Sequence, residues 1–274
     1  MDTALHTARL AALRADLATG APAAGAEKLA FGLEALDAAL PGGGLSRAAL
    51  HEVAGSGPEV EHATAATLFV AGLLARSCAQ DSGPLLGGPV LWVMQQRDLF
   101  APALAGAGLD PDRVIYAEVA RPSDVLLALE EALHHRGLAG VAGEFSGRFS
   151  LTASRRLQLA AEKAGLPCFL LRRSRRHDDP LLAEPCAAAT RWRLACLPTP
   201  PPLDNAPGLP GLAQARWQVA LIRCRGGTPK TWIVEACDAQ GRLGLPAEFL
   251  HRSDLRKQGG KQGERRRTAG HRTA

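Results

Sequence analysis

Short apolar runs alternate with longer amphipathic stretches through the first two thirds of this chain. Five of the runs have the length and composition of buried strands. These predicted strands are 48–53, 90–94, 113–119, 138–143 and 167–171, and the helices predicted between them are 59–80, 99–105, 123–136 and 152–164. Right-handed strand–helix–strand crossovers produce parallel sheets that are covered on both faces. The pattern therefore predicts an α/β fold with a mostly parallel central sheet flanked by helices.

The pattern changes after residue 171. Residues 190–197, 215–225 and 231–236 alternate between apolar and polar positions, which is typical of strands with one buried face. A Pro-rich segment at 198–210 and a Gly-Gly turn at 226–227 separate them. Adjacent strands joined by short turns are normally antiparallel, so the sheet is expected to end as a mixed one.

The chain is expected to have three parts. Residues 1–25 form an N-terminal helix, predicted at 3–18 from the spacing of its leucines, and a linker. Residues 26–250 form the core domain, which begins with a short helix at 33–40. Residues 251–274 form a basic tail that we expect to be disordered.

Composition narrows the class of protein. No apolar run approaches the roughly 20 residues of a membrane helix, and the N-terminus lacks a signal-peptide pattern, so a cytoplasmic protein without membrane contact is expected. The six cysteines include no CxxC pair and are expected to be buried thiols. The polar residues Glu130, Glu131, His134 and His135 are interpreted as one face of a helix, so no metal site is expected.

The segment after the first core strand has the outline of a phosphate-binding loop without its chemistry. A working loop reads GxxxxGK(S/T), because its amides and lysine hold phosphates and its hydroxyl holds magnesium. The corresponding residues here read GSGPEVEH. Gly55 and Gly57 are present, but Val60 replaces the second motif glycine, Glu61 replaces the lysine, and His62 replaces the hydroxyl. A carboxylate would repel phosphates, so no nucleotide cofactor is expected.

Positive charge gathers at two places. Eight Lys or Arg against two acids in 251–274 give the tail a charge of +6, whereas the whole chain carries +5. The tail residues predicted to contact a partner or a polyanion are Arg256, Lys257, Lys261, Arg265, Arg266 and Arg267. The second group follows the fifth strand and consists of Arg172, Arg173, Arg175 and Arg176. Two interpretations stay open for it: phosphate contacts with nucleic acid, or a solvated loop neutralised by neighbouring aspartates.

Trp192, Trp217 and Trp232 lie in the three later strands. Their alternating positions favour packing in the core, with anchors at a partner interface as the alternative.

Several long stretches resemble known families. FGLEALDAALPGGGLSRAALHEVAG is similar to the segment that leads into the phosphate loop of RecA-type recombinases, and the order of elements over residues 29–236 resembles the RecA core. The resemblance to the ImuA family is closer. It is carried by LDAALPGGGLSRAALHEVAG, GPVLWVMQQRDLFAPALAGAGLDPDRVIYAEVARPSDVLLALEEAL, LTASRRLQLAAEKAGLPCFLLR, TRWRL and RWQVALIRCRGG. ImuA proteins are RecA-like accessory proteins of the bacterial damage-inducible mutagenesis cassette.

The resemblance also shows where the chain departs from an active ATPase. Gln95 and Gln96 stand where RecA-type enzymes place a catalytic glutamate, and Glu144 stands where they place the magnesium-associated aspartate. An amide can hold a water molecule but cannot take its proton. Together with the altered loop, these positions predict a degenerate fold with no catalytic residues.

The resemblance implies a non-enzymatic adaptor in SOS-induced translesion synthesis. Its implied partners are an inactive, ImuB-like homologue of the Y-family polymerases and an error-prone C-family polymerase, with RecA and single-stranded DNA as further candidates. Two alternatives stay open: a divergent ATP-dependent DNA-binding protein of the RecA type, and a RecA-like inhibitor of cell division.

Overall fold

The computed structural model describes residues 27–79, 87–135, 137–174, 176–199, 201 and 213–246. The predicted N-terminal helix at 3–18 and the tail at 251–274 lie outside these ranges, as do most of the Pro-rich segment and Arg175. The predictions made for those residues therefore stay predictions.

A single eight-stranded sheet runs through the domain in the order β10-β9-β8-β3-β7-β6-β4-β5. Its parallel part consists of β3 (Ala49–Gly55), β4 (Val90–Met94), β5 (Val114–Glu118), β6 (Gly140–Ser146), β7 (Pro167–Arg173) and β8 (Thr190–Leu197). The antiparallel part consists of β9 (Arg216–Cys224), paired with β8, and β10 (Lys230–Glu235), paired with β9. The predicted mixed and mostly parallel sheet is confirmed, and β9 and β10 are antiparallel as expected. The first of the three later strands differs, because β8 is parallel to β3 and antiparallel only to β9.

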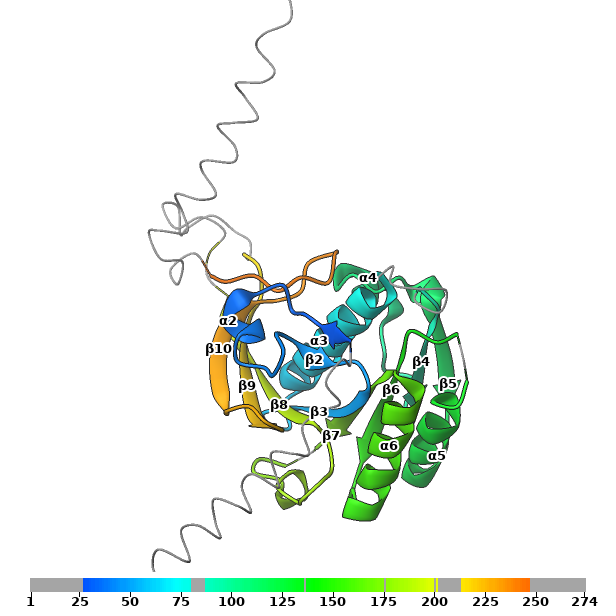
Figure 1. Ribbon diagram of the computed structural model, residues 1–274. Helices are drawn as coiled ribbons and strands as arrows, with labels where there is room; N and C mark the ends of the chain where they lie inside the picture. The colour runs from blue at the N-terminus through cyan, green and yellow to red at the C-terminus, as the bar shows by residue number, and fades with distance from the viewer. Residues whose placement is uncertain are drawn as a thin grey trace, which may run out of the picture.

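Helices cover both faces of the parallel part (Figure 1). On one face lies α3 (Val60–Ala79), which contacts β3 and β8. On the other face α5 (Pro122–Ala132) and α6 (Leu151–Ala164) lie side by side against β6, β4, β3 and β7. The shorter helices are α2 (Glu34–Asp37), α4 (Ala101–Gly106), η1 (Pro111–Arg113) and η2 (Pro180–Leu182).

Two apolar clusters fill the two sides of the sheet, because successive side chains of a strand point to opposite faces. Val53 of β3 packs on the α3 side, whereas its neighbour Leu50 packs on the side of α5 and α6. The three tryptophans are buried in the α3-side cluster, which confirms their interpretation as core residues. Trp192 also lies 5.5 Å from Phe31 between ring centroids.

Three details differ from the sequence prediction. A small antiparallel pair, β1 (Lys28–Leu29) and β2 (Leu45–Ser46), was not predicted, since each strand has only two residues. α5 ends at Ala132, so the predicted helix to residue 136 is too long, and His134 and His135 follow the helix. β6 continues to Ser146, which places Glu144 inside a strand. In the described ranges no helix combines the length and hydropathy needed to cross a membrane.

Candidate functional site

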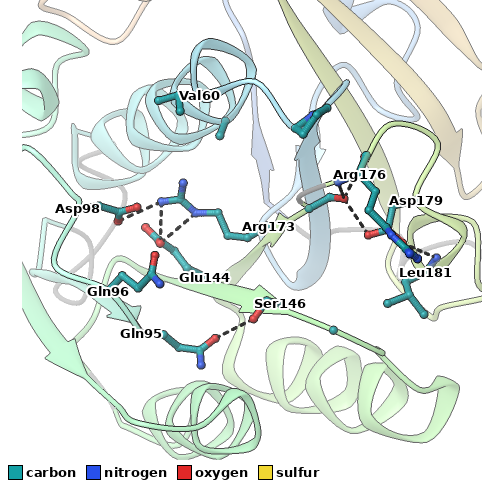
Figure 2. A pocket seen from close by; sticks show the side chains of 14 residues that line it. Val60, Gln95, Gln96, Asp98, Glu144, Ser146, Arg173, Arg176, Asp179 and Leu181 are labelled. Atoms are coloured by element: carbon teal, nitrogen blue, oxygen red, sulfur yellow. Dashed lines mark hydrogen bonds and ion pairs between the residues drawn. The ribbon is translucent and has the colours of Figure 1, made fainter.

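A cavity of about 530 Å3 lies at the carboxyl ends of the central parallel strands. This is the edge of an open α/β sheet where ligands ordinarily bind. Figure 2 shows its walls: the start of α3 at Val60, the end of β4 at Gln95 and Gln96, Glu144 of β6, and Arg173 of β7. The cavity therefore occupies the place where the sequence predicted a degenerate nucleotide site.

The loop between β3 and α3 is filled by one of its own side chains. A Cβ atom at Gly57 would collide with Oε2 of Glu59, so this carboxylate lies directly against the loop backbone. Oε2 of Glu59 is buried without a hydrogen-bond partner in the described residues but lies 3.8 Å from Nε2 of His62, and Oε1 lies 3.2 Å from Nε2 of His177. An acidic group thus occupies a loop whose functional counterpart would accept phosphate.

The two residues that replace the lysine and the hydroxyl do not face a common ligand. Glu61 is exposed in the first turn of α3. His62 packs beside β8, where its Nδ1 accepts a hydrogen bond of 3.1 Å from the backbone N–H of Cys196. The backbone N–H of Ser56 donates 2.8 Å to the carbonyl of Leu194 in the same strand. The backbone amide of Ser56 and the ring of His62 are therefore hydrogen-bonded to β8, although a phosphate-binding loop would present the groups at these positions to its ligand.

Glu144 is held inside the protein by three donors. Its side chain is 5% exposed, and Nη2 and Nε of Arg173 donate to its Oε2 at 2.7 and 3.1 Å. Nε1 of Trp92 donates to Oε1 at 3.0 Å. Nη2 of Arg173 also lies 3.4 Å from Oδ1 of Asp98 (Figure 2). A protein guanidinium thus supplies the positive charge that a metal ion would bring to this carboxylate.

Gln95 and Gln96 line the cavity between Glu144 and the start of α4. Oε1 of Gln95 accepts a hydrogen bond of 3.2 Å from the hydroxyl of Ser146. Neither amide is able to accept a proton from water at neutral pH, so these walls supply hydrogen bonds without a general base.

The structure divides the predicted arginine group, because β7 continues to Arg173 and contains its first two members. Arg172 is buried, with 5% of its surface exposed; its Nη2 donates 2.7 Å to the carbonyl of Gly147 and its Nη1 lies 3.6 Å from Glu52. Arg172 is therefore not placed to contact nucleic acid, and the predicted group of four loses this member. Arg173 is bound to Glu144, Arg175 lies outside the described residues, and Arg176 is exposed.

Arg172 belongs to a buried charge cluster that was not predicted. Arg191 donates to Oε1 of Glu52 at 3.0 Å, and Nη2 of Arg193 lies 3.5 Å from the same oxygen. Burial lowers the pKa of both Arg172 and Arg193, and the charge of Glu52 opposes that effect. Arg191 and Arg193 also donate to the carbonyl of Leu182. The cluster therefore fixes the segment after β7 to the sheet.

In the sequence, only charged residues within apolar strands indicated this cluster. Glu52 stands in ALHEVAG, and Arg191 and Arg193 alternate in TRWRL. Alternation is also what a strand with one solvent face shows, so sequence alone left open whether the two arginines point to water or to Glu52. No sequence pattern indicated that Glu59 fills the loop after β3, because the position of its side chain depends on the path of the loop backbone.

The described residues contain no group of His, Cys, Asp and Glu that could hold a metal ion. His135 lies 3.8 Å from Glu131 by its Nε2, but both side chains are largely exposed. The predicted helix face is confirmed only for Glu130 and Glu131, because α5 ends at Ala132 and both histidines follow it.

The fold and this cavity define the class of protein: an α/β protein with a mixed central sheet, in which the loop after the first core strand and the cavity beside it are occupied by the chain's own charged groups. The chain belongs to the ImuA family. It is 40% identical over 215 residues to Protein ImuA of Caulobacter vibrioides strain NA1000 / CB15N, and the match covers 77% of this chain and 84% of that protein. The Protein ImuA of strain ATCC 19089 / CIP 103742 / CB 15 gives the same values. No protein-family model matches the chain. The predicted family is confirmed.

Proposed function

We propose that this protein acts in damage-induced mutagenesis as a non-enzymatic adaptor with a degenerate RecA-like core, assembling error-prone polymerase components at damaged DNA. Membership of the ImuA family supports the setting, through the role that the resemblance implies for ImuA proteins. The order of helices and strands and the position of the loop after β3 agree with the RecA-like part of the proposal.

The self-filled loop is the observation that carries the non-enzymatic part. A phosphate group entering the loop would meet the carboxylate of Glu59 and would gain no lysine, because Glu61 holds that position. Coulomb repulsion between like charges at contact distance costs several kcal/mol at roughly the dielectric of a protein surface. Arg173 already neutralises Glu144, so magnesium would have to displace a guanidinium. Nucleotide binding and hydrolysis both lack their usual support.

The partners of the proposed adaptor are the inactive Y-family homologue and the error-prone C-family polymerase. A fold without chemistry of its own can still contribute by holding two such proteins together, which raises their effective concentration for each other. Contacts with RecA or single-stranded DNA belong to the same proposal, through Arg176, through Arg175 and through the basic tail.

Co-purification in the presence and absence of nucleotide tests the proposal. The full chain is co-expressed with the inactive polymerase homologue and with the C-family polymerase, and the complexes are measured by light scattering. We expect a stable complex that is the same without nucleotide and with magnesium–ATP. A complex that forms only with ATP, or ATP turnover by the purified chain, would restore the ATP-dependent alternative. Binding to a division protein in place of both polymerases would favour the inhibitor.

A measurement of mutation rates in cells tests whether the protein is needed for damage-induced mutagenesis. In a strain that lacks this gene, the wild-type chain should restore damage-induced mutation, and so should Glu61→Ala, because the loop has no role in catalysis. A loss of function in Glu61→Ala with normal protein levels would contradict the proposal.

A further inference from the structure

Within the described residues, no α-helix lies on one face of the antiparallel part of the sheet. The side chains of Trp217, Val219 and Leu221 in β9 belong to the α3-side cluster. The intervening residues therefore point to the opposite face, and the register places Ala220 beside Arg193 of β8 and Thr231 of β10. The apolar cluster under α5 and α6 contains no residue of β8, β9 or β10 among the described residues.

Apolar side chains are exposed on this uncovered face. Ile222 of β9 is 49% exposed and Ile233 of β10 is 36% exposed. The register pairs Ile233 with Gln218, so Ile233 points to the same side as Ala220. Ile222 lies at an irregularity in the pairing of β9 with β8, and its side chain lines the same groove as Gln218 and Ala220. An exposed apolar surface on a sheet that is otherwise covered by helices is typical of an interaction site.

A groove of about 520 Å3 runs beside this face. Its floor is formed by Gln218, Ala220 and Ile222 of β9, and its walls are the loop at 55–57 and the segment at 178–183. The second wall is fixed in place, because Nη2 of Arg193 donates 2.9 Å to the carbonyl of Leu182. The groove is therefore preformed, which reduces the entropy lost when a ligand binds.

The charge of the groove is set by arginines. Arg193 lines it and, together with Arg172 and Arg191 beneath the groove, makes up the three guanidiniums that surround the buried carboxylate of Glu52. Arg176, also in the lining, is exposed and has no ion pair among the described residues. The carboxylates of this region are those of Glu52, Asp178 and Asp179, one fewer than the guanidiniums. Both oxygens of Asp179 already accept hydrogen bonds from Ser174 and Leu181. The remaining positive charge, on the exposed Arg176, favours an anionic ligand.

We propose that this groove binds a short, apolar and acidic segment of a partner protein, with apolar side chains on Ala220 and Ile222 and a carboxylate at Arg176. The apolar floor fits side chains better than a sugar–phosphate backbone. The lining contains no aromatic residue on which a base would stack, and a single exposed guanidinium beside an aspartate gives few phosphate contacts.

The groove follows from the geometry alone, and the inference rests on the proposed adaptor function only for the identity of the partner as a polymerase component. It names the chemistry by which that partner would be recognised: carboxylates among apolar residues in an extended or helical segment.

Selection from a displayed library of short random peptides tests the inference without a known partner. The full chain is the target, and counter-selection uses the full chain with Ile222→Glu and Arg176→Glu. We expect the enriched peptides to combine acidic and apolar residues. Binding is then measured by fluorescence anisotropy with three labelled probes: an enriched peptide, the same peptide with every acidic residue changed to lysine, and an oligothymidylate.

Matched variants separate a specific groove from a general charge effect. Ile115 of β5 is also 49% exposed but lies on the far edge of the sheet, so Ile115→Glu matches Ile222→Glu. Arg155, exposed on α6, provides Arg155→Glu as the match for Arg176→Glu. We expect Ile222→Glu and Arg176→Glu each to weaken the acidic peptide by about tenfold or more, as substitutions at anchor positions do. The two matched variants should leave its affinity within about twofold of wild type, as for a surface change outside the contact.

Three results would overturn the inference. They are the absence of any acidic and apolar sequence enriched over the counter-selected variant, equal or tighter binding of the lysine peptide, and equal losses in the matched variants. Oligothymidylate that binds through the basic tail should bind Ile222→Glu as tightly as wild type, and a loss equal to that of the acidic peptide would also overturn the inference. A polymerase complex that still forms with Ile222→Glu would reject this groove as its contact while leaving the adaptor function intact.

Discussion

Arg173 gives Glu144 the positive charge that a metal ion would bring at this edge of the sheet. We therefore expect the ion pair between them to make a measurable contribution to the free energy of unfolding. Glu144 has 5% of its side chain exposed and Arg173 has 31%. Removing one member of a fully buried pair costs about 3–5 kcal/mol, because the other charge is left without a partner. Water reaches the exposed part of Arg173 and offsets part of that cost. We therefore expect Arg173→Met to lower the free energy of unfolding by about 2 kcal/mol.

Substitution of Glu144 should lower the free energy of unfolding by less than substitution of Arg173 does. Glu144→Gln removes the buried charge and leaves Arg173 with Asp98, 3.4 Å away, and with solvent. A loss of about 1 kcal/mol is expected, near that of one ordinary hydrogen bond. In the double variant no charge remains unpaired, so the combined loss should fall short of the sum of the single losses by about 1–2 kcal/mol.

Urea unfolding followed by tryptophan fluorescence measures all three variants. The control is Arg156→Met, because Nη2 of Arg156 lies 2.7 Å from Oε2 of Glu130, the same distance as in the Arg173–Glu144 pair. Arg156 is 59% exposed, so its loss should cost at most about 0.5 kcal/mol. Equal losses for Arg173→Met and Arg156→Met, or strictly additive losses in the double variant, would refute the reasoning.

Three further outcomes are expected. The double variant Glu61→Lys, His62→Thr should not bind ATP detectably in calorimetry at nucleotide concentrations of about 1 mM, because the loop still contains its own carboxylate. A submillimolar dissociation constant would contradict this account. Burial lowers the pKa of His51 from 6.5 to about 4 in the folded protein, so stability should be complete above about pH 6.5 and fall by about 3 kcal/mol as the pH drops to about 4. Urea midpoints against pH should show this slope, and His51→Gln should remove it. In Gly72→Ala the new Cβ would lie 2.5 Å from Sγ of Cys237, so the free energy of unfolding should fall by about 1–3 kcal/mol. Adding Cys237→Ala should recover much of that loss. A double variant as unstable as the single one would exclude this clash as the cause.

The sequence by itself determined the plan of the core. The change from helical to alternating periodicity after residue 171 predicted a parallel sheet that ends as a mixed one, and the structure has that sheet. Periodicity carries this information because it follows from burial of one face of each element, a local property of the chain. The sequence likewise places a carboxylate at Glu61 and an imidazole at His62, where a phosphate-binding loop has its lysine and hydroxyl.

Only the tertiary structure decided which charges are available. Arg172 and Arg176 are four residues apart and look alike in the sequence, yet one is buried against Glu52 and the other is exposed. The difference arises because Glu52 lies in the neighbouring strand β3, about 120 residues away along the chain, and the strand register pairs Arg172 with Ala54, two residues from Glu52 on the same face of the sheet. The filling of the loop by Glu59 and the uncovered face of β9 have the same origin, since both depend on how distant segments pack and not on the pattern of any one of them.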